Sequence, residues 1–430
     1  LVKDNEEKDW KKLFTWNMES RVLSRALRFT RDNKYIYLID AGDANTARVV
    51  KIDIATGIRE VIAEDPGYDV FHYLMDCNTC EIQAVAFYRE KLEWSVLDET
   101  IKDDFQSVEK LDRGDFFIRR NIDDTVWIVS FSKDTDPGSH YVYYRKSKKG
   151  QFLFSEHPAL KNYTLANMEP VTFTARDGLT IHGYLTCPPG KEKKNLPLVL
   201  RVHGGPWNRD IWLYTPEVQL FTNRGYACLQ INYRASKSYG KDFLNAGDME
   251  WGRKMLYDLA DGVKWAIDRN IADPEKIAVF GRSYGGYAAL TGATFTPELF
   301  CCAVDIYGIS NLVTFMKNIP PYWNTDFKAL LVKRVGDPET EEEFLKSRSP
   351  LFYADRIKIP MLIAQGANDA RVKQSESEQI VEVLKNKGVD YEYILFPDEG
   401  HSIIRPENRI KLYSAVEKFF AKHLGGRFEE

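Results

Sequence analysis

The chain has 430 residues, of which 44% are hydrophobic and 28% charged, so it can bury two cores without metals or disulfides. Its formal net charge of -4 argues against a nucleic-acid partner. No apolar run reaches the length of a membrane-spanning helix, which argues against a transmembrane segment.

The first part of the chain is rich in short β-type runs separated by polar turns. Polar turns precede strands near Asp32, Asn78 and Asp124, which lie 46 residues apart. That spacing falls in the range of β-propeller blades. We therefore predict a partial all-β propeller of about three blades over residues 1–165. Residues 166–430 alternate strands with helices and should form a separate α/β domain.

The length of the β-rich part is unusual for a propeller. It provides roughly three and a half blades, whereas closed propellers have about four to eight. The sequence also begins at Leu1 rather than at a methionine. We expect a longer polypeptide whose N-terminal propeller fragment completes the ring. The alternative is a half-propeller that is completed by self-association.

A glycine-rich turn follows the predicted buried strand at 196–202. Its sequence, His203-Gly204-Gly205-Pro206, resembles turns that offer a main-chain N–H to the oxyanion formed during acyl transfer. Gly205 is the preferred donor and Gly204 the second choice. We expect the ring of His203 to fasten the turn by a hydrogen bond rather than to act in catalysis.

The stretch VFGRSYGGYAAL at 279–290 places a serine at a predicted junction between a strand and a helix. The spacing Gly281-x-Ser283-x-Gly285 is that of a nucleophile elbow, in which small neighbours allow a strained, sharp turn. Ser283 is therefore the candidate nucleophile. The backbone N–H of Tyr284, the next residue, is the second candidate oxyanion donor.

A serine nucleophile needs a histidine base and an acid that orients the histidine. In the fold that uses this elbow, the three residues occur along the chain in the order serine, acid, histidine. His401 follows the β-type run YEYILF on a loop, whereas His423 shows helical spacing, so His401 is the candidate base. Asp369 lies in the turn after an apolar run at 360–365 and is the candidate acid. Asp398 and Glu399 compete with it, but they lie too near His401 in the chain to approach its ring correctly.

Together, these motifs resemble the prolyl oligopeptidase family of serine peptidases, and they cover most of residues 170–425. The matching stretches are HGGP at 203, NYRASKSYGKDFLNAGDMEWG at 232–252, GRSYGGY at 281, GANDARV at 366 and EGHSIIRPENR at 399–409. The HGGP turn is most similar to that of acylaminoacyl peptidases. The resemblance implies an α/β hydrolase catalytic domain with a doubly wound, mostly parallel sheet, preceded by a propeller. It also implies short peptide substrates, with access limited by the propeller or by a homo-oligomer.

The family resemblance further implies substrate-binding residues. Arg371 corresponds to a position that reaches the carbonyl of the residue before the one cleaved, a task that suits a fixed cation. Phe315, Tyr322 and Trp323 lie where relatives place aromatic pocket walls, although core packing would also account for them. Trp207, next to the HGGP turn, lies near the expected acyl site.

We therefore predict a serine peptidase that hydrolyses short peptides through an acyl-enzyme, and the family resemblance implies an oligopeptidase, an acylaminoacyl peptidase or a dipeptidyl peptidase. The alternatives are an esterase or amidase for small acyl compounds, and a binding module that has lost the chemistry. No cofactor or metal is expected, because Cys77-x-x-Cys80 has no second pair with ligand spacing. Six scattered cysteines fit reduced thiols and thus a cytoplasmic location.

Overall fold

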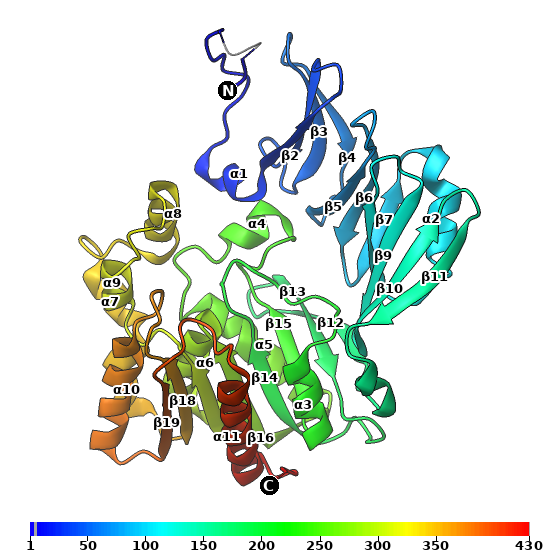
Figure 1. Cartoon of the computed structure of the whole chain (residues 1–430). Coiled ribbons are helices and arrows are strands. Elements are labelled where there is room, and N and C mark those ends of the chain that lie inside the picture. Colours follow the sequence, from blue (N-terminus) through cyan, green and yellow to red (C-terminus); the bar gives the residue numbers. More distant parts are fainter. Residues whose placement is uncertain (4–6, 430) are drawn as a thin grey trace. The chain divides into compact units, whose positions relative to one another are not determined.

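The computed structural model describes residues 1–3 and 7–429, which form two compact units (Figure 1). The first unit comprises residues 1–163 with the segments 211–214 and 237–245, and the second comprises the remainder. The predicted domain boundary after residue 165 stays a prediction.

The first unit consists of three antiparallel sheets, with the strand orders β1-β2-β3-β4, β5-β6-β7 and β11-β10-β9-β8. Their strands are β1 Arg25–Phe29, β2 Tyr35–Asp40, β3 Arg48–Asp53, β4 Arg59–Ala63, β5 Val70–Met75, β6 Ile82–Tyr88, β7 Leu92–Val96, β8 Asp115–Arg120, β9 Val126–Lys133, β10 Asp136–Tyr144 and β11 Lys149–Ser155. Asp32, Asn78 and Asp124 each lie in the turn between the first and second strands of a sheet. Each 46-residue repeat is thus one sheet, consistent with the predicted partial propeller.

The central strand β6 shows why these sheets stack face to face. All seven of its residues are buried, and successive side chains enter different apolar clusters. Val85 and Phe87 pack with the first sheet, whereas Ala84 packs with the third. A strand that is apolar on both faces needs a neighbouring layer on each side, as a propeller blade has.

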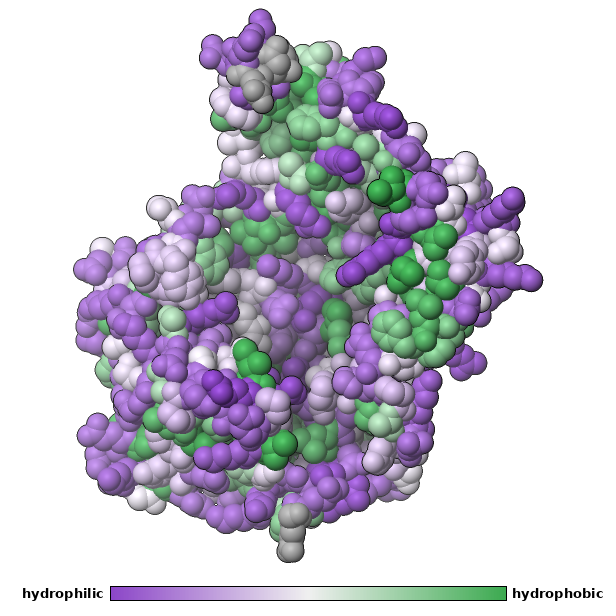
Figure 2. Space-filling view, in the orientation of Figure 1, coloured by the Kyte–Doolittle hydropathy of each residue, from purple (hydrophilic) through white to green (hydrophobic). Residues whose placement is uncertain are grey.

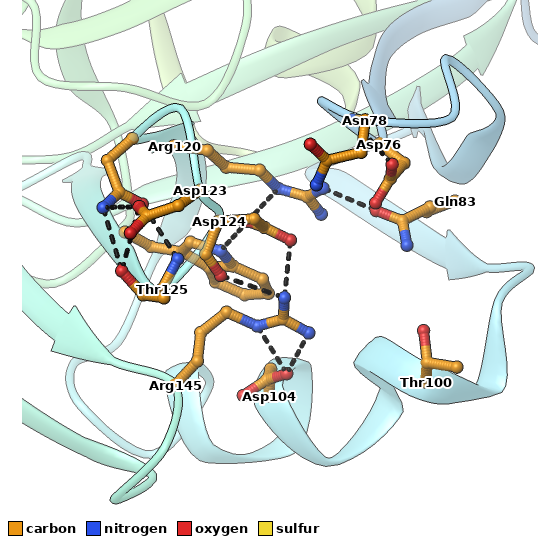
Figure 3. A network of polar contacts seen from close by, with 12 residues as sticks. Asp76, Asn78, Gln83, Thr100, Asp104, Arg120, Asp123, Asp124, Thr125 and Arg145 are labelled. Atoms are coloured by element: carbon orange, nitrogen blue, oxygen red, sulfur yellow. Dashed lines mark hydrogen bonds and ion pairs between the residues drawn. The ribbon is translucent and has the colours of Figure 1, made fainter. Parts of the chain in front are cut away.

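A buried charge network joins a helix of this unit to its third sheet (Figure 3). Arg145 donates to Asp104 of helix α2 (Lys102–Val108) through Nε at 3.1 Å and Nη2 at 3.0 Å, and to Asp124 through Nη1 at 2.5 Å. Asp124 also accepts the indole N–H of Trp127 at 2.7 Å. Because the Asp104 and Asp124 side chains are only 0% and 6% exposed, they depend on these partners in place of water.

The second unit is built on one eight-stranded sheet of order β12-β13-β15-β14-β16-β17-β18-β19. The strands are β12 Met168–Thr174, β13 Thr180–Thr186, β14 Leu196–Val202, β15 Ala227–Asn232, β16 Ala272–Arg282, β17 Cys302–Ile306, β18 Met361–Gly366 and β19 Tyr391–Phe396. The pairings β12–β13 and β13–β15 are antiparallel, and all later pairings are parallel. This mixed, mostly parallel sheet confirms the predicted α/β hydrolase fold class.

Helices cover both faces of this sheet (Figure 1). Alternate strand residues such as Ala278 and Phe280 share an apolar cluster with α3 (Pro216–Arg224) and α11 (Pro406–Leu424). Val279 points the other way, towards α6 (Tyr284–Phe295). The remaining helices of this unit are α5 Lys254–Asp268, α7 Leu312–Lys317, α8 Thr325–Val335, α9 Glu342–Ser347 and α10 Gln374–Lys387. The loops after β14, β16, β18 and β19 leave the carboxyl edge of the parallel strands, where open α/β sheets bind ligands.

Replacing Arg145 with methionine should destabilise the first unit by about 2 kcal/mol, because it removes three hydrogen bonds to two buried carboxylates and leaves each with one cation, Lys148 at Asp104 and Arg120 at Asp124. Arg145→Lys keeps the positive charge and should lower the free energy of unfolding by a smaller amount. Denaturant unfolding of each variant measures the difference. A loss below about 1 kcal/mol for the methionine variant would contradict the dependence of the two carboxylates on Arg145.

Candidate active site

Ser283 occupies a strained turn between β16 and α6. Its φ of 56° and ψ of −119° are rare for a residue other than glycine. A Cβ on Gly281 would lie 2.1 Å from the carbonyl oxygen of Gly285, and one on Gly285 would lie 2.2 Å from that of Val202. Only glycines therefore let the turn close against β14, and the serine is left at the tip.

His401 connects Ser283 to Asp369. Its Nε2 lies 3.1 Å from Ser283 Oγ, and its Nδ1 lies 2.7 Å from Asp369 Oδ2. Because a carboxylate oxygen accepts, Nδ1 carries the proton, and Nε2 is free to accept from the serine hydroxyl. This arrangement can remove a proton from Ser283 as it attacks an acyl carbon.

The second carboxylate oxygen of Asp369 is held by the backbone of its own loop. The Asp369 side chain is fully buried, and its Oδ1 accepts backbone N–H groups from Arg371 at 2.8 Å and from Val372 at 2.9 Å. Both carboxylate oxygens thus have hydrogen-bond partners, which a buried group without access to water requires. The carboxylate consequently has one orientation, with Oδ2 facing His401.

Backbone contacts tie the acid loop after β18 to the histidine loop after β19. The N–H of Ala367 donates to Phe396 O at 2.9 Å, and that of Asn368 donates to Glu399 O at 2.9 Å. Gly366 lies so close to the histidine loop that a Cβ there would be 2.2 Å from Gly400 O. These contacts set the separation between Asp369 and His401.

The competing candidates have other partners. Glu399 accepts the backbone N–H groups of Ile404 and Arg405, just before α11, at 3.1 and 2.8 Å. Asp398 forms an ion pair with Arg405 at 3.1 Å. His423 lies on α11, where its ring packs against Phe419 at 4.7 Å between centroids. The structure therefore brings Asp369, rather than Asp398 or Glu399, to His401.

The HGGP turn lies beside the serine. Gly205 and Tyr284 line the same cavity as Ser283, whereas Gly204 is not among the lining residues. Gly205 has a φ of 130°, which favours glycine. These positions allow the N–H groups of Gly205 and Tyr284 to serve as the two oxyanion donors.

The ring of His203 holds this turn in place. Its Nδ1 lies 3.0 Å from Gly204 O and its Nε2 lies 3.0 Å from Ser236 Oγ, and the ring stacks on Tyr233 at 4.4 Å. Burial lowers the pKa of His203, so the neutral ring is favoured. The expected fastening role agrees with these contacts.

The cavity at Ser283 has a volume of about 300 Å³ and a largely aromatic wall. It is lined by Gly205, Trp207, Trp251, Ser283, Tyr284, Ile309, Phe315, Trp323, Phe327, Leu331, Arg371, Val372 and His401. Four of the five predicted substrate-binding residues are thus brought together, namely Trp207, Phe315, Trp323 and Arg371. Tyr322 is not, because its side chain is 64% exposed in the turn that follows Pro320 and Pro321.

Several lining residues escaped the sequence prediction. Phe327 and Leu331 lie four residues apart on α8, and their helical spacing was the available signal. The ring of Phe327 meets Trp207 at 6.2 Å and Trp323 at 4.9 Å, both edge to face. Trp251, at the end of the stretch 232–252, packs edge to face on Tyr284 at 4.6 Å.

The described residues provide neither a metal site nor a membrane-spanning helix. In the described part of the chain, no group of three or more His, Cys, Asp or Glu side chains is arranged to hold a metal ion. No helix among the described residues is both long and apolar enough to cross a membrane. All six cysteines are free thiols, including Cys77 and Cys80.

Gly366→Ala should separate the acid and histidine loops and reduce the rate at which a fluorophosphonate modifies Ser283 by about 100-fold, because small displacements of a base are costly. Gly400→Ala is the matched control, since its Cβ would meet only Asn368 O, at 3.7 Å. Time-resolved labelling measures both rates. Equal rates for the two variants would contradict the dependence of the site on this close approach.

Comparisons with known proteins identify the family of the chain. The sequence model of the prolyl oligopeptidase family matches residues 212–427. Dipeptidyl aminopeptidase BIII of Pseudoxanthomonas mexicana is 44% identical over 98% of this chain and 62% of its own length. Dipeptidyl peptidase family member 6 of Caenorhabditis elegans is 35% identical over 99% of this chain and 61% of its own length.

The fold is also shared with solved structures. A puromycin-hydrolyzing peptidase of Mycobacterium tuberculosis superposes with a TM-score of 0.81 at 22% identity, over 94% of this chain and 62% of that one. This chain therefore spans about 60% of the length of these three relatives. The family resemblance seen in the motifs is confirmed: the chain belongs to the prolyl oligopeptidase family.

Proposed function

We propose that the protein is a serine peptidase that releases dipeptides from the N-termini of short peptides. The observation that carries the chemistry is the pair of hydrogen bonds made by His401, which accepts from Ser283 Oγ at 3.1 Å and donates to Asp369 Oδ2 at 2.7 Å. An apolar cavity opens at the same serine and provides space for one substrate side chain.

The proposed reaction proceeds through an acyl-enzyme. Ser283 Oγ bonds to the scissile carbonyl carbon while its proton passes to His401 Nε2, and the N–H groups of Tyr284 and Gly205 stabilise the oxyanion. The carbon–nitrogen bond then breaks as Nε2 gives that proton to the leaving amine. Water then bonds to the ester carbon and gives a proton to Nε2, the bond between that carbon and Oγ breaks as Nε2 returns the proton to Oγ, and the acid product leaves. Asp369 remains ionised and orients the imidazole throughout.

Two features support a dipeptide product with an apolar second residue. Two relatives that match nearly the whole chain are named as a dipeptidyl aminopeptidase and a dipeptidyl peptidase family member. The wall of the cavity is formed largely by Trp207, Phe315, Trp323 and Phe327, which suits an apolar side chain next to the scissile bond. Arg371 also lines the cavity, and its guanidinium makes no hydrogen bond or ion pair with the described residues, which suits binding of a substrate carbonyl.

The surroundings of the site in the whole protein are also proposed. Additional blades should complete the propeller and limit access to short peptides, since three sheets are fewer than closed propellers contain. Support comes from β11, an edge strand on which Phe152, Leu153 and Phe154 are 46%, 43% and 53% exposed. Apolar side chains gather over this region in Figure 2. A further blade or a second copy of the chain would bury them. A cytoplasmic location stays a prediction from the free cysteines.

Mass spectrometry of the products from a peptide mixture tests this function. Peptides with free N-termini and apolar second residues should yield dipeptides, whereas their N-acetylated counterparts should be cleaved much more slowly. Ser283→Ala is the control and should lose at least about a thousand-fold in kcat without unfolding, because it removes the atom that attacks.

Other products would identify the alternatives. Release of single acetylated residues would instead indicate an acylaminoacyl peptidase. Turnover of nitrophenyl esters without peptide cleavage would favour an esterase. If the folded full-length protein neither cleaved peptides nor hydrolysed esters, a binding role would replace the proposed one.

A further inference from the structure

The turn that follows β17 places an aromatic ring against His401. The ring centroids of Tyr307 and His401 lie 4.9 Å apart, with their planes inclined by 51°. Tyr307 is 5% exposed, so the contact is made away from solvent. Burial raises the pKa of the Tyr307 phenol to about 12, so the ring that faces His401 is neutral at physiological pH.

The backbone at Tyr307 is strained in a way that core packing alone does not require. Its φ of 44° lies in the left-handed region, which a bulky side chain avoids. Two hydrogen bonds hold this conformation: Tyr307 N–H donates to Ala364 O at 2.7 Å, and Gly308 N–H donates to Asp305 Oδ1 at 2.8 Å. Strain that is maintained beside reacting groups points to a role for the strained residue.

The same turn also contacts the nucleophile. The carbonyl oxygen of Ile306 accepts the N–H of Ser283 at 3.0 Å, and the next residue, Tyr307, contacts the histidine. Two consecutive residues of β17 and its turn therefore set the positions of the serine and of its base. A shift of this turn would move both groups.

The contact with the Tyr307 ring limits a motion of the imidazole that the two hydrogen bonds of His401 leave free. Those bonds are made in the ring plane through Nδ1 and Nε2, so they limit tilting of the ring about the line between the two nitrogens only weakly. When Ser283 is acylated, its Oγ has no proton to donate, and one of the two bonds is lost. The ring must nevertheless stay in place to accept a proton from water.

We propose that Tyr307 is a positioning residue that holds the imidazole of His401 in place while Ser283 is acylated. The inference rests on the proposed function, since it concerns the second half of that reaction. Deacylation should depend on Tyr307 more than acylation does, because the hydrogen bond from Ser283 Oγ supports His401 only before the acyl-enzyme forms.

Three variants of the full-length protein distinguish the effect of the Tyr307 ring from the effects of its hydroxyl group and of its strained backbone. Tyr307→Phe keeps the ring and removes the hydroxyl. Tyr307→Leu keeps an apolar group without a ring. Tyr307→Asn also lacks the ring but tolerates positive φ, so it relieves the backbone strain. Stopped-flow measurement of the burst with a dipeptide nitrophenyl ester gives acylation and deacylation rates separately.

The phenylalanine variant should retain both rates within about three-fold, whereas the leucine and asparagine variants should lose about ten-fold or more in deacylation and less in acylation. The inference is wrong if a folded ring-less variant deacylates at the wild-type rate. It is equally wrong if the phenylalanine variant loses as much as the leucine variant. A wild-type protein with no more turnover than Ser283→Ala would overturn the proposed function, and this inference with it.

Discussion

The hydrogen bond between His401 Nδ1 and Asp369 Oδ2 is the contact on which the candidate site depends. It selects the tautomer in which Nε2 accepts, and it orients that nitrogen towards Ser283. A buried carboxylate can make this bond only because two backbone N–H groups satisfy its other oxygen. The acid loop is therefore as much a part of the site as the serine.

The sheet makes this contact possible. Ser283, Asp369 and His401 follow three different parallel strands, β16, β18 and β19, whose carboxyl ends meet at one edge. Glycines allow the loops to approach more closely than side chains would, at Gly281 and Gly285 around the serine and at Gly366 beside the histidine loop. The strain in the turns at Ser283 and Tyr307 is held by hydrogen bonds to the neighbouring strands β17 and β18.

Local signals were sufficient to predict the sheet and the central residues of the site. Each candidate in the central trio follows a short apolar run that ends at Gly or Pro, and the turn type limits which residues can stand there. The blade repeat was visible because its polar turns recur at a fixed spacing. These features depend on a few neighbouring residues, so the sequence alone carries them.

The features that the sequence did not predict depend on tertiary packing. The outer wall of the cavity comes from α8, where Phe327 and Leu331 resemble any apolar helix face until their neighbours are known. Tyr322 has the residue type of a pocket wall, yet its turn leaves it exposed. Tyr307 carries no motif, and only its backbone and its contact with His401 distinguish it. The segments 211–214 and 237–245 join the first unit although they lie within the α/β part of the chain.

The central claim is that His401 and Asp369 activate Ser283, and the most direct measurement is the site and rate of its modification by a fluorophosphonate. Peptide mapping by mass spectrometry should find a single adduct on Ser283 in the folded wild-type protein. The rate should fall by at least about a hundred-fold in His401→Ala, because the serine loses its base. An adduct on another serine, or modification of Ser283 at an unchanged rate without His401, would contradict the account.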